Sequence, residues 1–244
     1  MRASKLRFRT LRIGTAVLAV AAAAVSHPAL AQQAGVAQAL QQKLAAVKTA
    51  AAANQAALRQ YMWTETIQVS VNGEVKTTKQ MSCRYGPDGK PQCSPIGNQP
   101  PPPQQGGIRG RIAEKKKEEF TDYMQQVKGL IGLYVPPDAG RMEAAKAAGN
   151  VSLALPAGGE AGLVFRNYAL PGDSMTLDFS MATKKLTGLS VNTYLGDASS
   201  PVTLNVQFAT LPDGTNFPAQ QVVNAAAKGI KVTVANSNYA RLAN

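Results

Sequence analysis

The hydrophobic period changes three times along this chain. Residues 33–60 carry apolar side chains at intervals of three and four, which is typical of an amphipathic helix. From residue 61 the interval becomes two, as in strands that bury one face. A second helical stretch covers residues 108–135, and alternation returns after residue 150 and continues almost to the end. The pattern therefore predicts an α+β protein.

The segments after residue 150 are expected to form a curved antiparallel sheet. Apolar runs recur there at a spacing of about ten residues, with turn signals such as Pro212-Asp213-Gly214 between them. In residues 174–181, apolar and polar side chains alternate without interruption. Such alternation predicts one apolar and one solvated face.

Two shorter segments lie between the strands. A third helix is predicted from Asp138 to Ala148, because Pro136 and Pro137 precede it and Gly149 can cap its end. The proline-rich stretch at residues 98–107 is predicted to be an extended connector that is too short to separate domains.

The first 31 residues are predicted to be a removable signal peptide. Residues 1–12 contain five basic and no acidic side chains, and the apolar run that follows is too short to span a membrane. Ala29 and Ala31 supply the small residues that signal peptidase requires. Cleavage after Ala31 leaves residues 32–244, expected to be one domain in the periplasm or outside the cell.

This cleavage limits the chemistry of the mature chain. It removes His27, the only histidine. Catalytic triads, acid–base catalysis and metal ligation that use a histidine are therefore excluded. The mature chain has no Ser-x-x-Lys motif, phosphate loop or acidic metal loop. Asp173 and Asp178 are an odd number of residues apart and are expected on opposite faces of a strand. We therefore predict no catalytic residues, no cofactor and no metal.

The net charge of the mature chain indicates which classes of partner it can bind. Losing the signal peptide lowers the formal net charge from +12 to +7. In an exported protein, anionic lipids, envelope polymers or envelope proteins are better candidates than nucleic acid. The densest basic cluster lies in the second predicted helix, and it is either a solvated helix face or a contact for an anionic surface. It consists of Arg109, Arg111, Lys115, Lys116 and Lys117.

Cys83 and Cys93 are predicted to form a disulfide across a hairpin. An even number of cysteines in an exported chain favours a disulfide. A three-residue loop with Gly89 in the left-handed conformation closes Gly86 on Lys90. Counting outward then sets the two cysteines opposite each other as a close, non-hydrogen-bonded pair.

A carboxylate interrupts the apolar row that begins at Tyr61. Glu65 follows Trp63 in this row, and the register of the next hairpin determines its neighbour. A two-residue Asn72-Gly73 turn would set Trp63 opposite Ser82. A three-residue loop would set Glu65 opposite Lys79, as an ion pair across the strands. The second interpretation is a polar pair, Glu65 and Lys79, that faces a cavity and a polar ligand end.

The order of the elements resembles the outer-membrane lipoprotein carrier fold. That fold is shared by the periplasmic carrier LolA, its acceptor LolB and the N-terminal domain of the regulator MucB/RseB. The stretch from "YALPGDSMTLDFSM" to "LPDGTNFP" also resembles a family of exported bacterial proteins. The resemblance is one of pattern and topology over most of the mature chain, and no ligand-binding motif is carried over.

The resemblance implies an incomplete half-barrel that wraps around amphipathic helices and holds acyl chains in a cavity. The expected function is non-enzymatic binding of a lipid, acyl chain or lipoprotein in the periplasm. The alternative is an interaction module with a filled core that binds an anionic polymer, membrane surface or protein through its basic helix. Adaptable apolar side chains are the cavity candidates: Trp63, Met81, Met124, Met175, Phe179, Met181 and Phe208.

Overall fold

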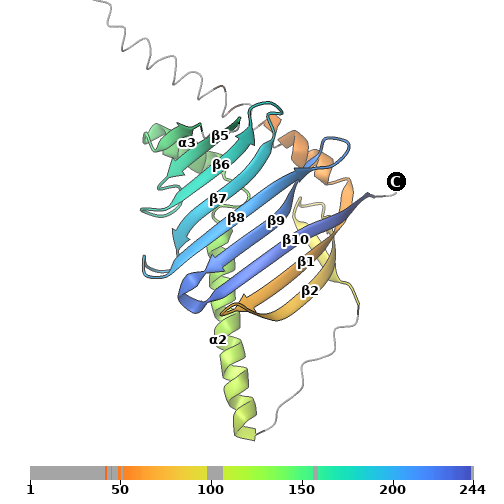
Figure 1. Cartoon of the computed structure of the whole chain (residues 1–244), viewed down its shortest axis with the longest axis vertical. Helices are drawn as coiled ribbons and strands as arrows, with labels where there is room; N and C mark the ends of the chain where they lie inside the picture. Colours follow the sequence, from red (N-terminus) through yellow and green to blue (C-terminus); the bar gives the residue numbers. More distant parts are fainter. Residues whose placement is uncertain are drawn as a thin grey trace, which may run out of the picture. The chain divides into compact units, whose positions relative to one another are not determined.

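Ten antiparallel strands form one open sheet in the computed structural model of this protein (Figure 1). The structure describes residues 42, 45, 49–50, 52–97, 107–155 and 159–242. The order across the sheet is β3-β2-β1-β10-β9-β8-β7-β6-β5-β4. The strands are β1 Tyr61–Val71, β2 Glu74–Tyr85, β3 Pro91–Pro95, β4 Val151–Ala154, β5 Glu160–Arg166, β6 Ser174–Ser180, β7 Leu186–Tyr194, β8 Pro201–Thr210, β9 Asn216–Ala225 and β10 Ile230–Arg241.

The α+β class and the antiparallel sheet are confirmed. The seven strands from β4 to β10 follow the predicted apolar runs, and β1 lies beside β10, so the N-terminal hairpin unit continues the same sheet (Figure 1). A 3-10 helix, Ala226–Lys228, connects β9 to β10.

The described helices lie close to their predicted positions, and capping residues mark both ends of α3. Residues 42, 45, 49–50 and 52–58, in the predicted helix at 33–60, are helical, and residues 59–60 form a turn. Helix α2 is Gly107–Ile131 and helix α3 is Ala139–Ala147. The Asp138 carboxylate accepts a hydrogen bond from the Arg141 N–H at 2.8 Å and caps α3. Gly149, with φ 73°, follows α3 as predicted. The predicted signal peptide and most of the proline-rich connector lie outside the described residues.

The cysteine hairpin is confirmed in detail. The Gly86 N–H donates to the Lys90 carbonyl at 2.8 Å, and Gly89 has a φ of 75°. Cys83 lies opposite Cys93, with a Cα–Cα distance of 4.1 Å, and the two form a disulfide. The bond is typical of a protein that folds in an oxidising compartment.

The predicted pairing of Glu65 with Lys79 is wrong. The hairpin has the two-residue Asn72-Gly73 turn, but a bulge between Val69 and Ser70 shifts the register by one residue. Glu65 therefore lies opposite Met81, and Lys79 lies opposite Ile67. The bulge also overturns the other predicted register, because Cys83 takes the place of Ser82 opposite Trp63.

One face of the sheet is apolar across nearly all of its strands. Side chains directly opposite each other share a face, so the strand registers trace rows perpendicular to the strands. The "Val191 row" contains Val69, Val232, Val223, Leu204, Val191, Met175, Phe165 and Val151. The neighbouring row contains Ile67, Val234, Gln221, Val206, Leu189, Leu177, Leu163 and Leu153.

Candidate ligand-binding face

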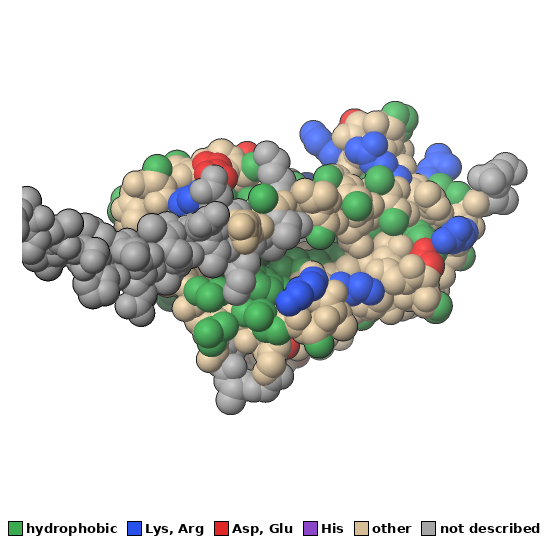
Figure 2. Space-filling model, turned by 90° about the horizontal axis from the view of Figure 1, so that it is seen from above, with side chains coloured by type: hydrophobic (Ala, Val, Ile, Leu, Met, Phe, Trp, Pro, Cys, Tyr) green, Lys and Arg blue, Asp and Glu red, His purple; other side chains and the backbone are tan. Residues whose placement is uncertain are grey.

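The apolar face is buried over one half and partly exposed over the other. In the Val191 row, the side chains from β5 to β8 are at most 1% exposed. In the same row the side chains of β9, β10 and β1 are partly exposed. We call these parts the closed half, β5 to β8, and the open half, β9, β10 and β1. In the space-filling view, hydrophobic side chains gather in a hollow with Lys and Arg side chains near its rim (Figure 2).

The end of α2 helps to bury the closed half. Val127 and Leu130 are buried, and so is Tyr134, which follows α2 and is 0% exposed. The Tyr134 hydroxyl donates to Asp173 at 2.6 Å and lies 2.7 Å from the Thr193 hydroxyl of β7. Burial, together with the hydrogen bond to Asp173, raises the pKa of Tyr134 far above its ordinary value.

Asp173 is a structural acid that the sequence did not reveal. It precedes β6 and is 2% exposed, so the predicted strand geometry for Asp173 and Asp178 does not apply. Its carboxylate accepts hydrogen bonds from the backbone N–H groups of Tyr168, Ala169 and Leu170 at 2.6 to 3.0 Å. With Tyr134, these donors account for the buried charge.

A groove of about 480 Å³ lies beside the end of α2. It is open to solvent and is not lined by any of the seven cavity candidates. Its lining comes from α2 and the turn after it, from the segment before β6, and from the end of β7 and the residues that follow: Gln126, Gly129, Leu130, Leu133, Leu170, Tyr194, Leu195 and Gly196.

The seven candidates occupy different parts of the fold. Met175 and Phe179 are buried on β6 in the closed half. Trp63 and Met81 lie on β1 and β2. The other three, Met124, Met181 and Phe208, are partly exposed and lie in α2, in the turn after β6 and in β8, respectively.

Trp63 belongs to an aromatic cluster at one end of the open half, formed with Tyr85, Phe217 and Tyr239. Trp63 stacks on Tyr239, with 5.7 Å between ring centroids, and its ring centroid lies 5.1 Å from that of Tyr85. Phe217 lies 4.4 Å from Tyr239 on the same measure. Trp63 is only 5% exposed, so the cluster shields it from water.

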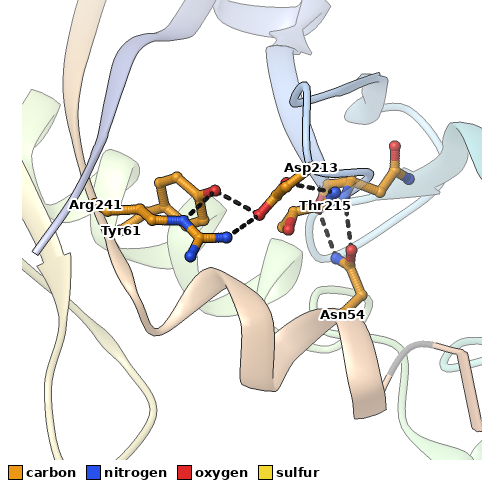
Figure 3. A network of polar contacts seen from close by, with 6 residues as sticks. Asn54, Tyr61, Asp213, Thr215 and Arg241 are labelled. Carbon is orange, nitrogen blue, oxygen red and sulfur yellow. Dashed lines mark hydrogen bonds and ion pairs between the residues drawn. The ribbon is translucent and has the colours of Figure 1, made fainter.

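A polar network fixes the ends of the strands that carry this cluster (Figure 3). The Tyr61 hydroxyl donates to Asp213 at 2.5 Å, and the Arg241 guanidinium donates to the same carboxylate at 2.8 Å. Hydrogen bonds from Tyr61, from the Thr215 N–H and from Arg241 hold the pKa of Asp213 well below its usual range. The start of β1 and the end of β10 are thereby tied to the β8–β9 turn.

The N-terminal helix is tied to the same turn. The Asn54 side-chain amide donates to the Asn216 carbonyl and accepts from the Asn216 N–H, both at 2.6 Å (Figure 3). An asparagine side chain here pairs with the backbone as a neighbouring strand would. The position of the aromatic cluster therefore depends on contacts across long sequence distances.

Glu65 lies beside this cluster, opposite Asn236 on β10 as well as Met81 on β2. A Glu65 carboxylate oxygen and the sulfur atoms of Cys83 and Cys93 lie within 4.8 Å of one another, but the sulfurs are joined in the disulfide and are not metal ligands. Burial raises the pKa of Glu65. Within the described part of the chain, no cation lies at ion-pair distance from this carboxylate.

Two residues that neighbour Glu65 in the sheet each have a polar atom that is buried without a hydrogen-bond partner in the described structure. They are the Trp63 Nε1, a donor, and the Asn236 Oδ1, an acceptor. The Asn236 Nδ2 donates to the Pro218 carbonyl at 2.9 Å, which fixes the orientation of the amide. Each unsatisfied atom costs the fold roughly 1–3 kcal/mol. Asn236 interrupts the apolar alternation of Val232 and Val234, as Glu65 interrupts that of β1. This interruption is the sequence signal that could have identified Asn236 as a candidate site residue.

The predicted basic cluster is balanced by acidic residues. Arg111, Lys115, Lys116 and Lys117 are exposed, while the Arg109 side chain lies outside the described structure. Residues 111–122 also contain Glu114, Glu118, Glu119 and Asp122, so this stretch has equal numbers of basic and acidic side chains. Two apolar side chains, Ile112 and Phe120, are exposed on the same stretch.

None of the helices in the described residues is long and apolar enough to cross a membrane. Comparisons with protein-family models, with curated proteins and with solved structures found no match to this chain. The site's own geometry must therefore carry the functional argument.

Proposed function

We propose that this protein is a non-enzymatic, periplasmic binding protein that holds a lipid or acyl chain against the open half of its sheet. The observation that carries the proposal is the uneven cover of one continuous apolar face. The Val191 row is buried on β7 and β8 and partly exposed where Val223, Val232 and Val69 continue it. An apolar surface of this kind on a soluble protein marks a binding site.

The dimensions of the open half suit an acyl chain. Neighbouring strands are separated by about 4.8 Å, so three strands offer an apolar track of roughly 10–15 Å. Val234 and Ile67 widen the track on one side. The resemblance to lipoprotein carriers supports the same function, and in that fold the helices would lie inside the curve of the sheet. The disulfide and the predicted signal peptide support export.

A second function is favoured by the exposed Ile112 and Phe120 on α2. In this alternative, the helix binds an envelope partner or a membrane surface, and the core needs no ligand. The equal numbers of acidic and basic residues in 111–122 argue against attraction to an anionic surface as its driving force.

The first experiment is mass spectrometry of organic extracts from the exported protein, purified without detergent. A lipid recovered in stoichiometric amount supports the proposal and names the ligand class. A second measurement uses the neutral fluorescent probe N-phenyl-1-naphthylamine, which should bind the purified protein and be displaced by lysophospholipids below their micelle concentration.

A matched pair of variants locates the binding. Val232→Glu puts a charge on the open half, whereas Thr233→Glu puts it on the opposite face of the same strand. Val232→Glu should weaken probe binding at least about tenfold, and Thr233→Glu should leave it within about twofold. Absence of lipid from the extract together with no probe binding would contradict the proposal and favour the interaction module.

A further inference from the structure

We propose that Trp63, Glu65 and Asn236 form a headgroup subsite that selects an ethanolamine phospholipid. In this subsite the ligand ammonium donates to the Glu65 carboxylate and the Asn236 Oδ1, and a phosphate oxygen accepts from the Trp63 Nε1–H. The inference rests on the proposed function, because the lipid's acyl chain would lie on the adjacent open half.

The first step is the placement of the three side chains. Glu65 and Asn236 are directly opposite each other on β1 and β10, and side chains so paired lie on one face. Trp63 is two residues before Glu65 in the same strand and lies on that face too. The three therefore meet at the end of the apolar track formed by Ile67 and Val69.

The second step is the hydrogen-bonding chemistry that the site leaves unsatisfied. Trp63 and Asn236 are 5% and 8% exposed, and the Nε1 of one and the Oδ1 of the other have no partner among the described residues. An indole N–H can only donate, and this amide oxygen can only accept. A ligand that satisfies both atoms must therefore present an acceptor and a donor.

The third step is charge. The Glu65 carboxylate has no cationic partner in the part of the chain that the structure describes, and the surrounding aromatic faces attract cations. A fatty-acid carboxylate would be repelled by Glu65. A glycerol headgroup offers donors without positive charge, and a choline offers charge without N–H donors. Among these groups, ethanolamine alone combines a cationic N–H donor with a phosphate acceptor.

Access to the subsite comes from its rim. Glu65 and Tyr85 are only partly buried, so their side chains can turn toward solvent and admit a small polar group. The network at Tyr61 and Arg241 meanwhile holds the ends of β1 and β10 in place. The site is thus built on fixed strands with a movable edge.

The test uses the Trp63 indole N–H resonance in ¹⁵N-labelled mature protein, which is a single signal because the chain has one tryptophan. Titration with millimolar glycerophosphoethanolamine should shift this signal downfield and reach saturation. Glycerophosphocholine and glycerophosphoglycerol should bind at least about tenfold more weakly. Lysophosphatidylethanolamine should then displace N-phenyl-1-naphthylamine at least about tenfold better than lysophosphatidylglycerol of equal chain length.

The variant for this test is Glu65→Gln, which keeps the size of the side chain and removes its charge. It should abolish the preference for ethanolamine over the choline and glycerol headgroups. The charge-matched control is Glu74→Gln, at the far end of the same hairpin and paired with Lys76, which should keep the preference.

The outcomes separate this inference from the proposed function. An indole signal that does not respond, responds equally to the three headgroups, or still prefers ethanolamine in Glu65→Gln overturns the subsite, whether or not the probe binds. A selective shift without any probe binding overturns the acyl-chain function and leaves a subsite for soluble phosphoethanolamine compounds, which contradicts its assignment to a phospholipid.

Discussion

The closed and open halves of the sheet have the same alternating pattern, but their apolar side chains are buried to different extents. Val191 and Val232 belong to one row on the same face, yet Val191 is 1% exposed and Val232 is only partly buried. Buried polar groups differ in the same way. Asp173, beside the closed half, accepts four hydrogen bonds, whereas Trp63 and Asn236, beside the open half, each leave an atom without a partner.

This contrast distinguishes buried polar groups that stabilise the fold from buried polar groups that are available to a ligand. A buried acid whose two oxygens both accept hydrogen bonds from the chain stabilises one arrangement of that chain. A buried donor or acceptor that finds no protein partner costs stability, and a ligand that satisfies it recovers that cost on binding. The closed half is therefore expected to supply stability, and the open half to supply binding.

The largest expected effect comes from Asp173→Ala. The substitution leaves the buried N–H of Tyr168, the partly buried N–H groups of Ala169 and Leu170, and the Tyr134 hydroxyl without their common acceptor. The free energy of unfolding should fall by about 3–5 kcal/mol in urea denaturation. Lipid-probe binding at a temperature where the variant remains folded should be unchanged. A loss below about 1 kcal/mol would show that Asp173 does not hold the closed half together.

A matched pair of core truncations tests the comparison directly. Val191→Ala and Val232→Ala remove the same two methyl groups from one row of the sheet. Val191→Ala should cost about 2–3 kcal/mol, because a cavity replaces buried contacts, while Val232→Ala should cost less than about 1 kcal/mol. Equal costs in denaturant titrations would mean that both halves are equally packed and would remove the basis for a binding face.

Removing the disulfide should have a smaller effect. Cys83 and Cys93 are ten residues apart, so the bond closes a short loop at the edge of the open half. The double variant Cys83→Ser/Cys93→Ser should lose about 2 kcal/mol and still fold. Non-reducing mass spectrometry of the wild type provides the control, and two alkylatable thiols there would contradict the hairpin register.

Much of this fold could be predicted from local signals. The hairpin at Gly86 to Lys90, the helix from Ala139 and the strands from β4 to β10 each depend on residues close in sequence. The bulge beside Val69 moved Glu65 away from Lys79, and nothing in the alternation marks a single inserted residue.

The site depends on tertiary contacts that the hydrophobic periodicity of the sequence cannot specify. Alternation shows that Val191 and Val232 face an apolar side, but not that Val191 is buried and Val232 partly exposed. The pairing of Glu65 with Asn236 requires β1 to meet β10 across most of the chain. Both residues interrupt an apolar alternation, so two such interruptions in one sequence are a signal that their strands are neighbours.

The smallest effect, and the sharpest test of the comparison, is the response of Glu65→Gln to pH. Burial raises the pKa of Glu65 above its ordinary value of 4.5, so its ionised form is less stable in the folded than in the unfolded chain. Below that ordinary value the carboxyl is protonated in both states and costs nothing. The cost appears as pH rises through 4.5 and is complete above the raised folded pKa.

Glu65→Gln should therefore have a higher melting temperature than the wild type near neutral pH, and this gain should vanish in acid. Glu74→Gln, an exposed acid paired with Lys76, should show no such pH-dependent gain. If Glu65→Gln is instead less stable at every pH, Glu65 holds the fold together and resembles Asp173. A variant that is more stable but no longer distinguishes lipid headgroups would show that the open half gives up stability for binding.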